Sequence, residues 1–545
     1  MTDSCAGIRA ATLGTLCLLA AATATAAERE YGTAVPPGAR AGDLSTAPCE
    51  VHLDGDDRSY PGDCGTLVVP ENRRDPASRL IALPVTRVRA TGAAPLEPIF
   101  WFQGGPGNPN SMDYPTDGLL ARHDLVIVGY RGADGQVTLP CPEIGDAIRE
   151  AYGAALGDRA LASYGQAGAA CVTRLRAAGI DLDGYSMLQT IDDNEAARTA
   201  LGYERINLYG NSYGTRVELL YQWRHPDSIH RVALVSVNPP GHFVWEPARV
   251  EAQLGQYAVL CAQDAHCSSR TPDLLATLRE VSRNMPARWL GIPIDADAVR
   301  LMSFFGLMES ITPPGMPLPA SGPAVIDAWL DAAEGDASGM ALMSVLGRFL
   351  MPWMGSRGHG LAMGMSSPDL LPYLKNDYKA RLMPPGAILG SPMSAFLQAI
   401  AFGWPVSPDM STGEVPASAV ETLLVSGNID FSTPLEAARD KLLPQLSNGH
   451  QVVLRDFGHT ETIWNSQPEA RARLLNTWFD TGVVDASLYR HQPVSFNVER
   501  SWSGIAKTLL GLTVLVTAAL LLLAFVLVRK LCRRFAARPA GAGQP

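Results

Sequence analysis

Gly210-Asn211-Ser212-Tyr213-Gly214 is the stretch that decides the fold of this 545-residue chain, because it places a serine between two glycines at a predicted strand-to-helix junction. Residues 206–209 before it form a short apolar run typical of a strand, and residues 215–223 after it have the periodicity of a helix with one apolar face. A serine on such a tight turn adopts a strained backbone, and the glycines leave room for it. The pattern alone is short enough to occur by chance, so its interpretation as a nucleophile site depends on the rest of the chain.

A glycine-rich loop precedes this serine. Residues 98–101 (PIFW) are a strand candidate and are followed by Gln103-Gly104-Gly105-Pro106-Gly107. Adjacent glycines after a strand allow a backbone N–H to point into a site, and we expect that of Gly105 to do so. The N–H of Tyr213, directly after the serine, is the second expected donor. Two such donors stabilise the oxyanion of a tetrahedral intermediate, whereas the alternative interpretation is an ordinary Gly-Pro turn.

An acid and a histidine follow the serine in chain order. The strand candidate at residues 423–425 leads into Asp430, and that at residues 452–454 leads into Gly458-His459. Asp440 lies within a helical pattern, His450 lies in a polar turn, and Asp456 shares the loop of His459. We therefore expect Asp430 to orient His459, with Asp456 as the alternative acid. Oxyanion loop, serine, acid and histidine in this order are typical of the α/β-hydrolase fold.

These roles predict covalent catalysis without a cofactor. His459 would take the proton of Ser212 during attack, Asp430 would fix the imidazole, and water would then cleave the acyl-enzyme. We expect no metal, because the sequence has neither an HExxH nor a CxxC spacing. The glycine-rich loop lacks the GK[ST] ending of a phosphate-binding loop.

The motifs resemble those of the proline iminopeptidase and tripeptidyl aminopeptidase group of α/β-hydrolases. The residues that carry this resemblance are Gln103-Gly104-Gly105-Pro106-Gly107, Gly210-Asn211-Ser212-Tyr213-Gly214-Thr215, Gly427-Asn428-Ile429-Asp430 with Thr433-Pro434, and Gly458-His459. The resemblance extends over about residues 64–479. It implies a serine peptidase that acts on peptide N-termini. Gln103 stands where many members have histidine, and Asn238 stands where relatives often have aspartate.

Composition bounds the other possibilities. The net charge of −10 and the absence of a basic patch argue against a nucleic-acid partner. With 47% hydrophobic residues the chain is long enough to bury a large core and a cap.

Both ends of the chain are apolar. Residues 1–26 contain Arg9, an apolar stretch and the small residues Ala24-Thr25-Ala26, which is the pattern of a signal peptide. Residues 508–528 carry no charge over a length that spans the hydrocarbon of a bilayer. Basic residues follow directly, beginning with Arg529 and Lys530, and such a flank stays cytoplasmic. The sequence thus predicts a single-pass membrane protein with an extracytoplasmic catalytic domain, a cytoplasmic C-terminus and the lipid bilayer as a partner.

Six cysteines remain when those of the two ends are set aside. They are Cys49, Cys64, Cys141, Cys171, Cys261 and Cys267. An even number in an oxidising compartment predicts disulfide bonds. We expect neighbours in the sequence to pair, although six cysteines allow about 15 connectivities.

The fold class expected is α/β, with a mostly parallel sheet flanked by helices and a mainly helical cap inserted after the sixth strand. The predicted organisation is a signal peptide (1–26), a leader (27–63), a first core part (64–238), the cap (239–417), a second core part (418–490), a juxtamembrane linker (491–507), a transmembrane helix (508–528) and a basic tail (529–545).

The substrate is the least constrained prediction. Eleven of the 16 methionines lie between Met302 and Met393, where they fill either an irregular core or an apolar pocket. An aminopeptidase needs a carboxylate for the substrate ammonium, and the candidates are Glu246, Asp264 and Glu309, with Trp245 as a neighbouring contact. The alternative function is an esterase or lipase acting on apolar acyl chains. A non-catalytic binding protein is disfavoured, because every catalytic position is filled.

Overall fold

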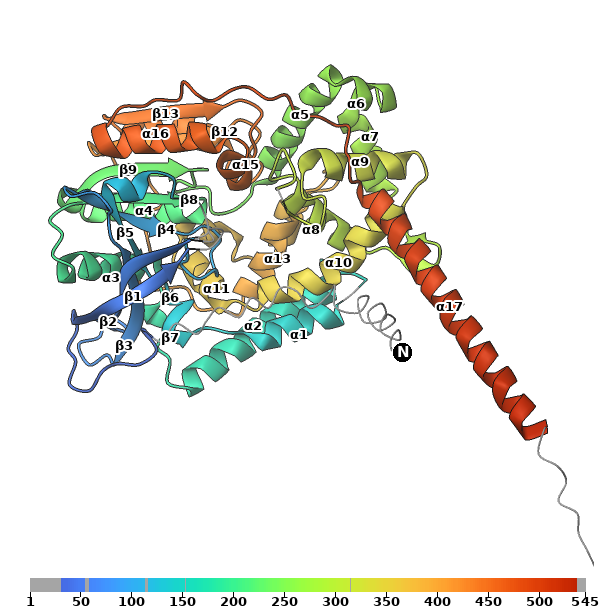
Figure 1. Ribbon diagram of the computed structural model, residues 1–545, viewed down its shortest axis with the longest axis horizontal. Coiled ribbons are helices and arrows are strands. Elements are labelled where there is room, and N and C mark those ends of the chain that lie inside the picture. Colours follow the sequence, from blue (N-terminus) through green and yellow to red (C-terminus); the bar gives the residue numbers. More distant parts are fainter. Residues whose placement is uncertain (1–30, 54–57, 113–115, 152, 314, 537–545) are drawn as a thin grey trace, which may run out of the picture.

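A twisted sheet forms the centre of the computed structural model, which describes residues 31–53, 58–112, 116–151, 153–313 and 315–536 (Figure 1). Within these ranges the sheet has nine strands, in the order β1-β2-β3-β5-β4-β8-β9-β12-β13. Their bounds are β1 (Leu44–His52), β2 (Ser59–Pro70), β3 (Leu80–Val88), β4 (Leu96–Phe102), β5 (His123–Val128), β8 (Ile206–Asn211), β9 (Ile229–Val235), β12 (Glu421–Gly427) and β13 (Gly449–Leu454). The strands from β5 to β13 in this order are parallel, and β1 to β3 join through antiparallel pairs. The predicted, mostly parallel sheet is confirmed.

One strand of this nine-stranded sheet was not identified from the sequence. β1 lies within residues 27–63, which were interpreted as a leader, and pairs with β2 along its whole length. Most of its residues are exposed and it contains Pro48, so it lacks the apolar run of a buried strand. As a consequence, the helical insertion follows the seventh strand of the sheet in chain order rather than the sixth. The predicted signal peptide, residues 1–26, lies outside the described residues.

Helices cover both faces of the sheet. The α-helices of the described residues are α1 (Pro142–Glu150), α2 (Asp158–Ala177), α3 (Met187–Ala200), α4 (Tyr213–Arg224), α5 (Pro247–Gln263), α6 (Ala265–Arg270), α7 (Leu274–Arg283), α8 (Ala296–Gly306), α9 (Gly322–Ala333), α10 (Ser338–Gly355), α11 (Gly358–Met365), α12 (Tyr378–Leu382), α13 (Pro392–Ala401), α14 (Leu435–Ala437), α15 (Thr460–Asn465), α16 (Pro468–Thr481) and α17 (Trp502–Ala536). Successive residues of β4 point to opposite faces: Phe100 and Phe102 join the core beneath α3 and α4, whereas Trp101 joins the core beneath α16.

The segment between β9 and β12 is mainly helical, from α5 to α13, and includes the short hairpin of β10 (Arg288–Trp289) and β11 (Ile292–Pro293). Two helices from an earlier part of the chain pack against it, α1 on α10 and α2 on α13 (Figure 1). The helical layer over the sheet is therefore assembled from two separate segments. Most of the methionine cluster is buried within it, as in an irregular helical core.

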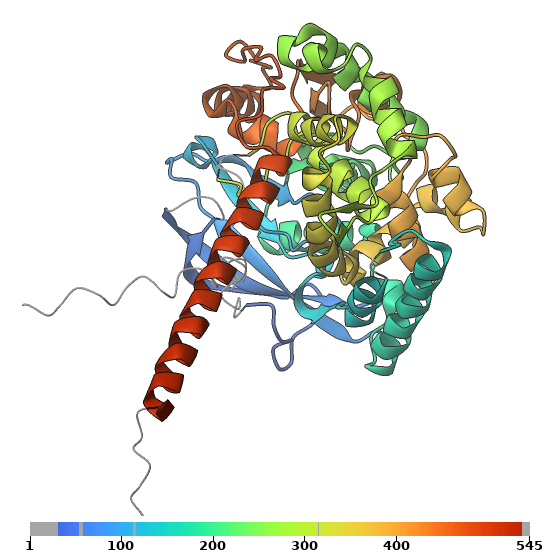
Figure 2. The same cartoon turned by 90° about the vertical axis from the view of Figure 1, so that its right-hand side faces the viewer.

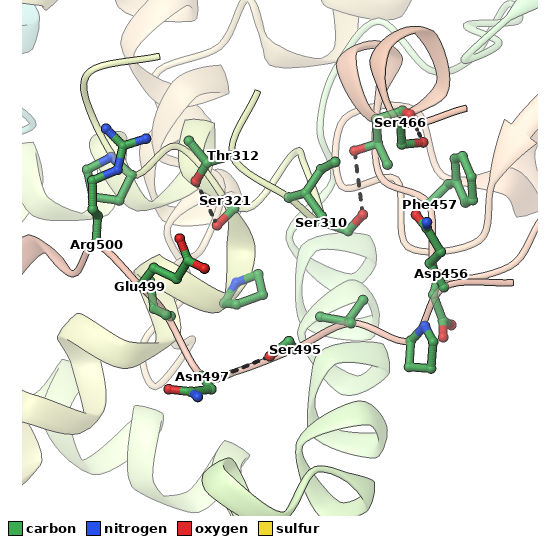
Figure 3. Close-up of a pocket in the computed structure, with 18 residues that line it drawn as sticks. Ser310, Thr312, Ser321, Asp456, Phe457, Ser466, Ser495, Asn497, Glu499 and Arg500 are labelled. Carbon is green, nitrogen blue, oxygen red and sulfur yellow. Dashed lines mark hydrogen bonds between the residues drawn. The ribbon is translucent and has the colours of Figure 1, made fainter. Parts of the chain in front are cut away.

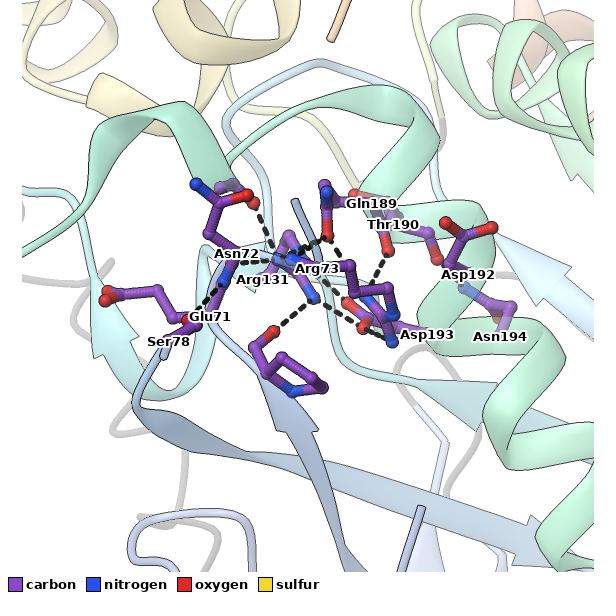
Figure 4. Close-up of polar contacts among 12 residues, drawn as sticks. Glu71, Asn72, Arg73, Ser78, Arg131, Gln189, Thr190, Asp192, Asp193 and Asn194 are labelled. Atoms are coloured by element: carbon purple, nitrogen blue, oxygen red, sulfur yellow. Dashed lines mark hydrogen bonds and ion pairs between the residues drawn. The ribbon is translucent and has the colours of Figure 1, made fainter. Parts of the chain in front are cut away.

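A buried ion pair fixes the loop that follows β5. Both oxygens of Asp193, on α3, accept hydrogen bonds from Arg131, at 2.7 and 2.6 Å, and both side chains are buried (Figure 4). Arg131 also donates to the carbonyl groups of Glu71 and Gly184, and Arg73 donates to Asp193 from outside. Because removing one partner would leave a buried charge, this network holds α3 against the end of β2.

Three disulfide bonds join sequence neighbours, as predicted: Cys49 with Cys64, Cys141 with Cys171, and Cys261 with Cys267. They link β1 to β2, the start of α1 to α2, and α5 to α6. Each therefore ties together two adjacent elements.

The last helix, α17, projects from the body as a single rod (Figure 2). Its first turn packs on α10, where Trp502 and Ser503 lie against Gly339, and Lys507 forms an ion pair of 2.5 Å with Asp336. Beyond this turn the helix has a mean hydropathy of 2.8 over its most apolar window, and none of that window is buried. By length and composition it is compatible with a single membrane span.

Candidate active site

Ser212 occupies a strained turn between β8 and α4, as predicted. Its backbone has φ 50° and ψ −120°, in a region that side-chain-bearing residues seldom occupy. The two glycines are required by the close approach of β4: a Cβ at Gly214 would lie 2.1 Å from the carbonyl oxygen of Phe102, and one at Gly210 would lie 2.4 Å from it. The turn thus presents the serine above the carboxyl edge of the sheet.

Ser212, His459 and Asp430 are brought together from three loops at this edge. Nε2 of His459 lies 3.0 Å from Oγ of Ser212, and Nδ1 lies 2.9 and 3.0 Å from the two carboxylate oxygens of Asp430. Asp430 is fully buried and is held by the N–H groups of Ser432 and Thr433 and by the hydroxyl of Thr433. This is the geometry in which a histidine accepts a serine proton while a carboxylate fixes its tautomer.

The charges around His459 favour its protonated form. Burial alone would lower the pKa of this imidazole, but the charge and hydrogen bond of Asp430, followed by Glu309, raise it above its ordinary value. An imidazole that holds a proton readily is suited to stabilising the imidazolium formed during serine attack.

The alternative residues are placed elsewhere. Asp456 accepts a hydrogen bond of 2.6 Å from Nε2 of His491, whereas the imidazole of His459 is bonded to Asp430. Asp440 is exposed and pairs with its neighbour Arg439, and His450 is exposed. Among the residues that the structure describes, Asp430 is the carboxylate that contacts the imidazole.

The loop before Ser212 has the form expected of an oxyanion hole. Gly104 donates its N–H to Oδ1 of Asn211 at 2.7 Å, and a Cβ on Gly104 would lie 3.0 Å from that of Ser212. Gly105 has φ +74°, and its N–H has no acceptor within the described part of the chain. Tyr213 is the first residue of α4, so its N–H has no partner within that helix.

Two residues that support this loop were missed from the sequence. The N–H of Gly107 donates to Nδ1 of His359, at 2.9 Å, and the N–H of Gln103 donates to Oδ1 of Asn110, at 2.8 Å. Burial lowers the pKa of His359 to about 3, so its ring stays neutral and accepts this bond. His359 is 252 residues from its partner, and no local pattern marks it.

A cavity of about 120 Å³ opens beside Ser212. Most of its lining is apolar, from residues that include Phe243, Trp245, Met354, Leu361, Leu370 and Leu397. Its polar lining consists of Ser212, Asn238, His242, Arg357, Ser394, Gln398 and Ser432 together with the backbone of the surrounding loops. Of the residues that line it, Arg357 is the one with a permanent charge.

Of the predicted substrate contacts, some line the cavity beside Ser212 and others do not. Trp245 lines the cavity, and its indole N–H donates to the carbonyl of Ser432 at 2.8 Å. Glu246 does not line it, and its carboxylate accepts a hydrogen bond from the hydroxyl of Tyr373. Asp264 begins α6, where it accepts from the N–H of Cys267. These two carboxylates thus have structural partners.

Glu309 lies behind the histidine rather than in the cavity. Its carboxylate accepts hydrogen bonds of 2.9 Å from the N–H groups of Glu461 and Thr462, in the first turn after His459. Burial raises the pKa of Glu309 to about 7. This carboxylate positions the segment that carries His459.

A larger cavity, of about 470 Å³, is lined by residues from three segments, 310–323, 456–466 and 492–500. In Figure 3, Asp456 and Ser466 border it opposite Glu499 and Arg500 of the segment before α17. None of Ser212, Asp430 and His459 lines it, so we place the active site at the smaller cavity.

Residues 98–258, which contain the oxyanion loop and Ser212, match the family model of the α/β hydrolase fold. The chain has the α/β-hydrolase fold. Residues 393–489 of this hydrolase, which contain Asp430 and His459, match the model of TAP-like proteins. The resemblance to the tripeptidyl aminopeptidase-like group is thereby confirmed.

Two curated relatives of the hydrolase are the tripeptidyl aminopeptidases of Streptomyces lividans and Streptomyces coelicolor, each 25% identical over 209 residues. The match covers 35% of this chain and 38% of each relative's length. Similar solved structures include a serine hydrolase from Cycloclasticus zankles (12% identity, TM-score 0.35, covering 81% of this chain and 100% of that one). An esterase from Exiguobacterium antarcticum has 13% identity and a TM-score of 0.35, covering 73% of this chain and 96% of that one.

Proposed function

We propose that the hydrolase uses Ser212 as a nucleophile and forms an acyl-enzyme. The observation that carries this proposal is the distance of 3.0 Å between Nε2 of His459 and Oγ of Ser212. His459 takes the serine proton as Oγ attacks the substrate carbonyl, and then gives it to the leaving group. The N–H groups of Gly105 and Tyr213 stabilise the oxyanion. Water, deprotonated by the same imidazole, cleaves the acyl-enzyme and regenerates the serine.

The substrate class proposed is a peptide from whose N-terminus residues are released. The similarity to tripeptidyl aminopeptidases supports it, and the match to TAP-like proteins includes both Asp430 and His459. Trp245 would contact the substrate in the cavity beside Ser212. Glu246, next in sequence, would reach an ammonium group only after giving up its bond to Tyr373.

An esterase acting on apolar acyl groups is the second candidate. The cavity beside Ser212 favours it, because its lining is mainly apolar and the described residues that form it include no carboxylate for a substrate ammonium.

A paired substrate panel separates these two functions. Peptidyl p-nitroanilides with a free amine, their N-acetylated forms and p-nitrophenyl esters of increasing chain length are compared by kcat/KM. An aminopeptidase cleaves the free-amine peptides and loses activity on acetylation. Preference for longer acyl esters, with no cleavage of any anilide, contradicts the peptidase proposal.

We propose further that the catalytic domain is exported and remains tethered to the membrane by α17. The apolar helix, the basic residues Arg529 and Lys530 that follow it, and the three disulfide bonds support this arrangement. A membrane-impermeant maleimide tests it at Cys532. This cysteine should be labelled only after lysis, whereas labelling in intact cells contradicts a cytoplasmic C-terminus.

A further inference from the structure

The cavity beside Ser212 contains a cation that has no acidic partner among the residues described by the structure. Arg357 precedes α11 and lines this cavity together with Met354, Gly360 and Leu361. Within the described residues, no Asp or Glu oxygen lies within ion-pairing distance of its guanidinium, and none lines the cavity. Most buried or half-buried arginines of this chain, such as Arg131 and Arg216, are instead paired with an aspartate.

Neutral groups hold Arg357 in place. Its guanidinium stacks on the ring of Trp353, 3.6 Å from the centroid, and donates a hydrogen bond to the side-chain oxygen of Asn108. A Cβ atom placed on Gly107 would lie 3.2 Å from the Cβ of Arg357, so the arginine packs directly against the oxyanion loop. These contacts orient the guanidinium without neutralising its charge, and burial lowers the pKa of Arg357.

The rest of the cavity also offers donors rather than negative charge. Gln398 is buried and lines the cavity, and its Nε2 has no hydrogen-bond partner in the part of the chain that the structure describes. His242 lines it as well, and burial together with the nearby Arg249 lowers its pKa to about 3, so the imidazole is neutral. An orphaned amide donor and an uncompensated guanidinium in one mainly apolar cavity match the requirements of a planar anion.

We propose that Arg357 binds a carboxylate of the substrate in the cavity beside Ser212. This inference rests on the proposed function, because it assumes that the substrate acylates Ser212. A guanidinium presents two parallel N–H donors to a carboxylate, which an ammonium group cannot do. The carboxylate comes either from an acidic side chain or from the free C-terminus of a short peptide.

Matched substrate pairs distinguish these two sources in the purified full-length chain. Glu is compared with Gln at each acyl-side position of peptidyl p-nitroanilides, and short peptides with a free C-terminus are compared with their amides by chromatography. We expect one pair to show a preference of about 10- to 100-fold in kcat/KM for the carboxylate, the range of a charge-assisted hydrogen bond. Equal rates within every pair overturn the proposal.

Variants then assign the preference to Arg357. R357Q should abolish the preference for the carboxylate member of the pair, and R357K should retain part of it. R149Q removes an exposed arginine from α1 and should change neither rate. Equal losses on both members of the pair in R357Q overturn the assignment.

Two further measurements distinguish a failure of the role proposed for Arg357 from a failure of the proposed function. N108A removes the hydrogen bond that holds Arg357 but keeps the charge of the guanidinium, so this variant should retain the preference for the carboxylate substrate. If Arg357 had only a structural role, N108A would instead lose the preference as R357Q does. An uncharged fluorophosphonate should label Ser212 in both R357Q and the wild type. Failure to label the wild type would refute the proposed function, whereas labelling without a substrate preference would refute only the role of Arg357.

Discussion

The backbone N–H of Gly107 donates a 2.9 Å hydrogen bond to Nδ1 of His359, which joins the oxyanion loop to the start of α11 in the helical layer. Both groups are buried, and the ring of His359 stacks on Tyr130 beneath the loop. The helical layer therefore not only covers Ser212 but also sets the conformation of the loop that receives the oxyanion.

Replacing His359 tests this coupling. H359A leaves the N–H of Gly107 without an acceptor, which costs about 1–3 kcal/mol in unfolding free energy. We expect kcat to fall at least about tenfold with a smaller change in KM, because loosened oxyanion donors act on the transition state. Chemical denaturation and steady-state kinetics measure the two effects, and H450A, at an exposed histidine, is the control. An unchanged kcat in H359A contradicts the coupling.

Asp430 and Asp456 form a matched pair of variants. D430N should lower kcat about 10³- to 10⁴-fold, because the amide cannot hold the imidazole in the tautomer that accepts the serine proton. D456N should leave kcat within about threefold of the wild type, since Asp456 contacts His491 and not His459. The assignment of the acid is wrong if the larger loss occurs in D456N.

The charge of Glu309 should affect the pH dependence of kcat/KM. Its negative charge raises the pKa of His459, so E309Q lowers that pKa. The acid limb of the kcat/KM profile reports deprotonation of the free histidine and therefore moves to lower pH. E469Q, at an exposed carboxylate on α16, should not move the limb. A shift of the E309Q limb to higher pH would show that Glu309 does not act through its charge.

The same carboxylate should affect stability. Because burial raises the pKa of Glu309 from 4.5 to about 7, the folded chain binds the proton more tightly than the unfolded chain. Its contribution to the unfolding free energy is therefore present below pH 4.5 and is lost as the pH rises towards 7. The stability difference between wild type and E309Q should fall over this window in denaturant titrations. A constant difference contradicts the burial of an ionisable group at this position.

Truncation tests the membrane span. A chain ending at Lys507 keeps the packing of Trp502 and the ion pair with Asp336 but lacks the apolar part of α17. We expect it to be soluble and to retain the kcat of the full chain, whereas the full chain fractionates with membranes. Release of the full chain from membranes by alkaline carbonate would contradict a spanning helix.

Local sequence patterns predicted those features of the fold and of the site that are determined by residues close together in the sequence. The turn at Ser212, the order of Asp430 and His459, and the pairing of neighbouring cysteines follow from strand, turn and spacing signals. β1 escaped prediction because an exposed edge strand has no apolar run. Arg357 and His359 escaped because their partners, Asn108 and Gly107, lie about 250 residues away and meet them only when the helical layer folds over the sheet.

Covalent labelling of Ser212 tests the central claim most directly. The full-length chain and S212A are treated with a fluorophosphonate, and the peptide that contains residue 212 is analysed by mass spectrometry. One adduct on Ser212 in the wild type and none in S212A is the predicted result. Equal labelling of both proteins, or an adduct on another serine, would contradict the assignment of the nucleophile.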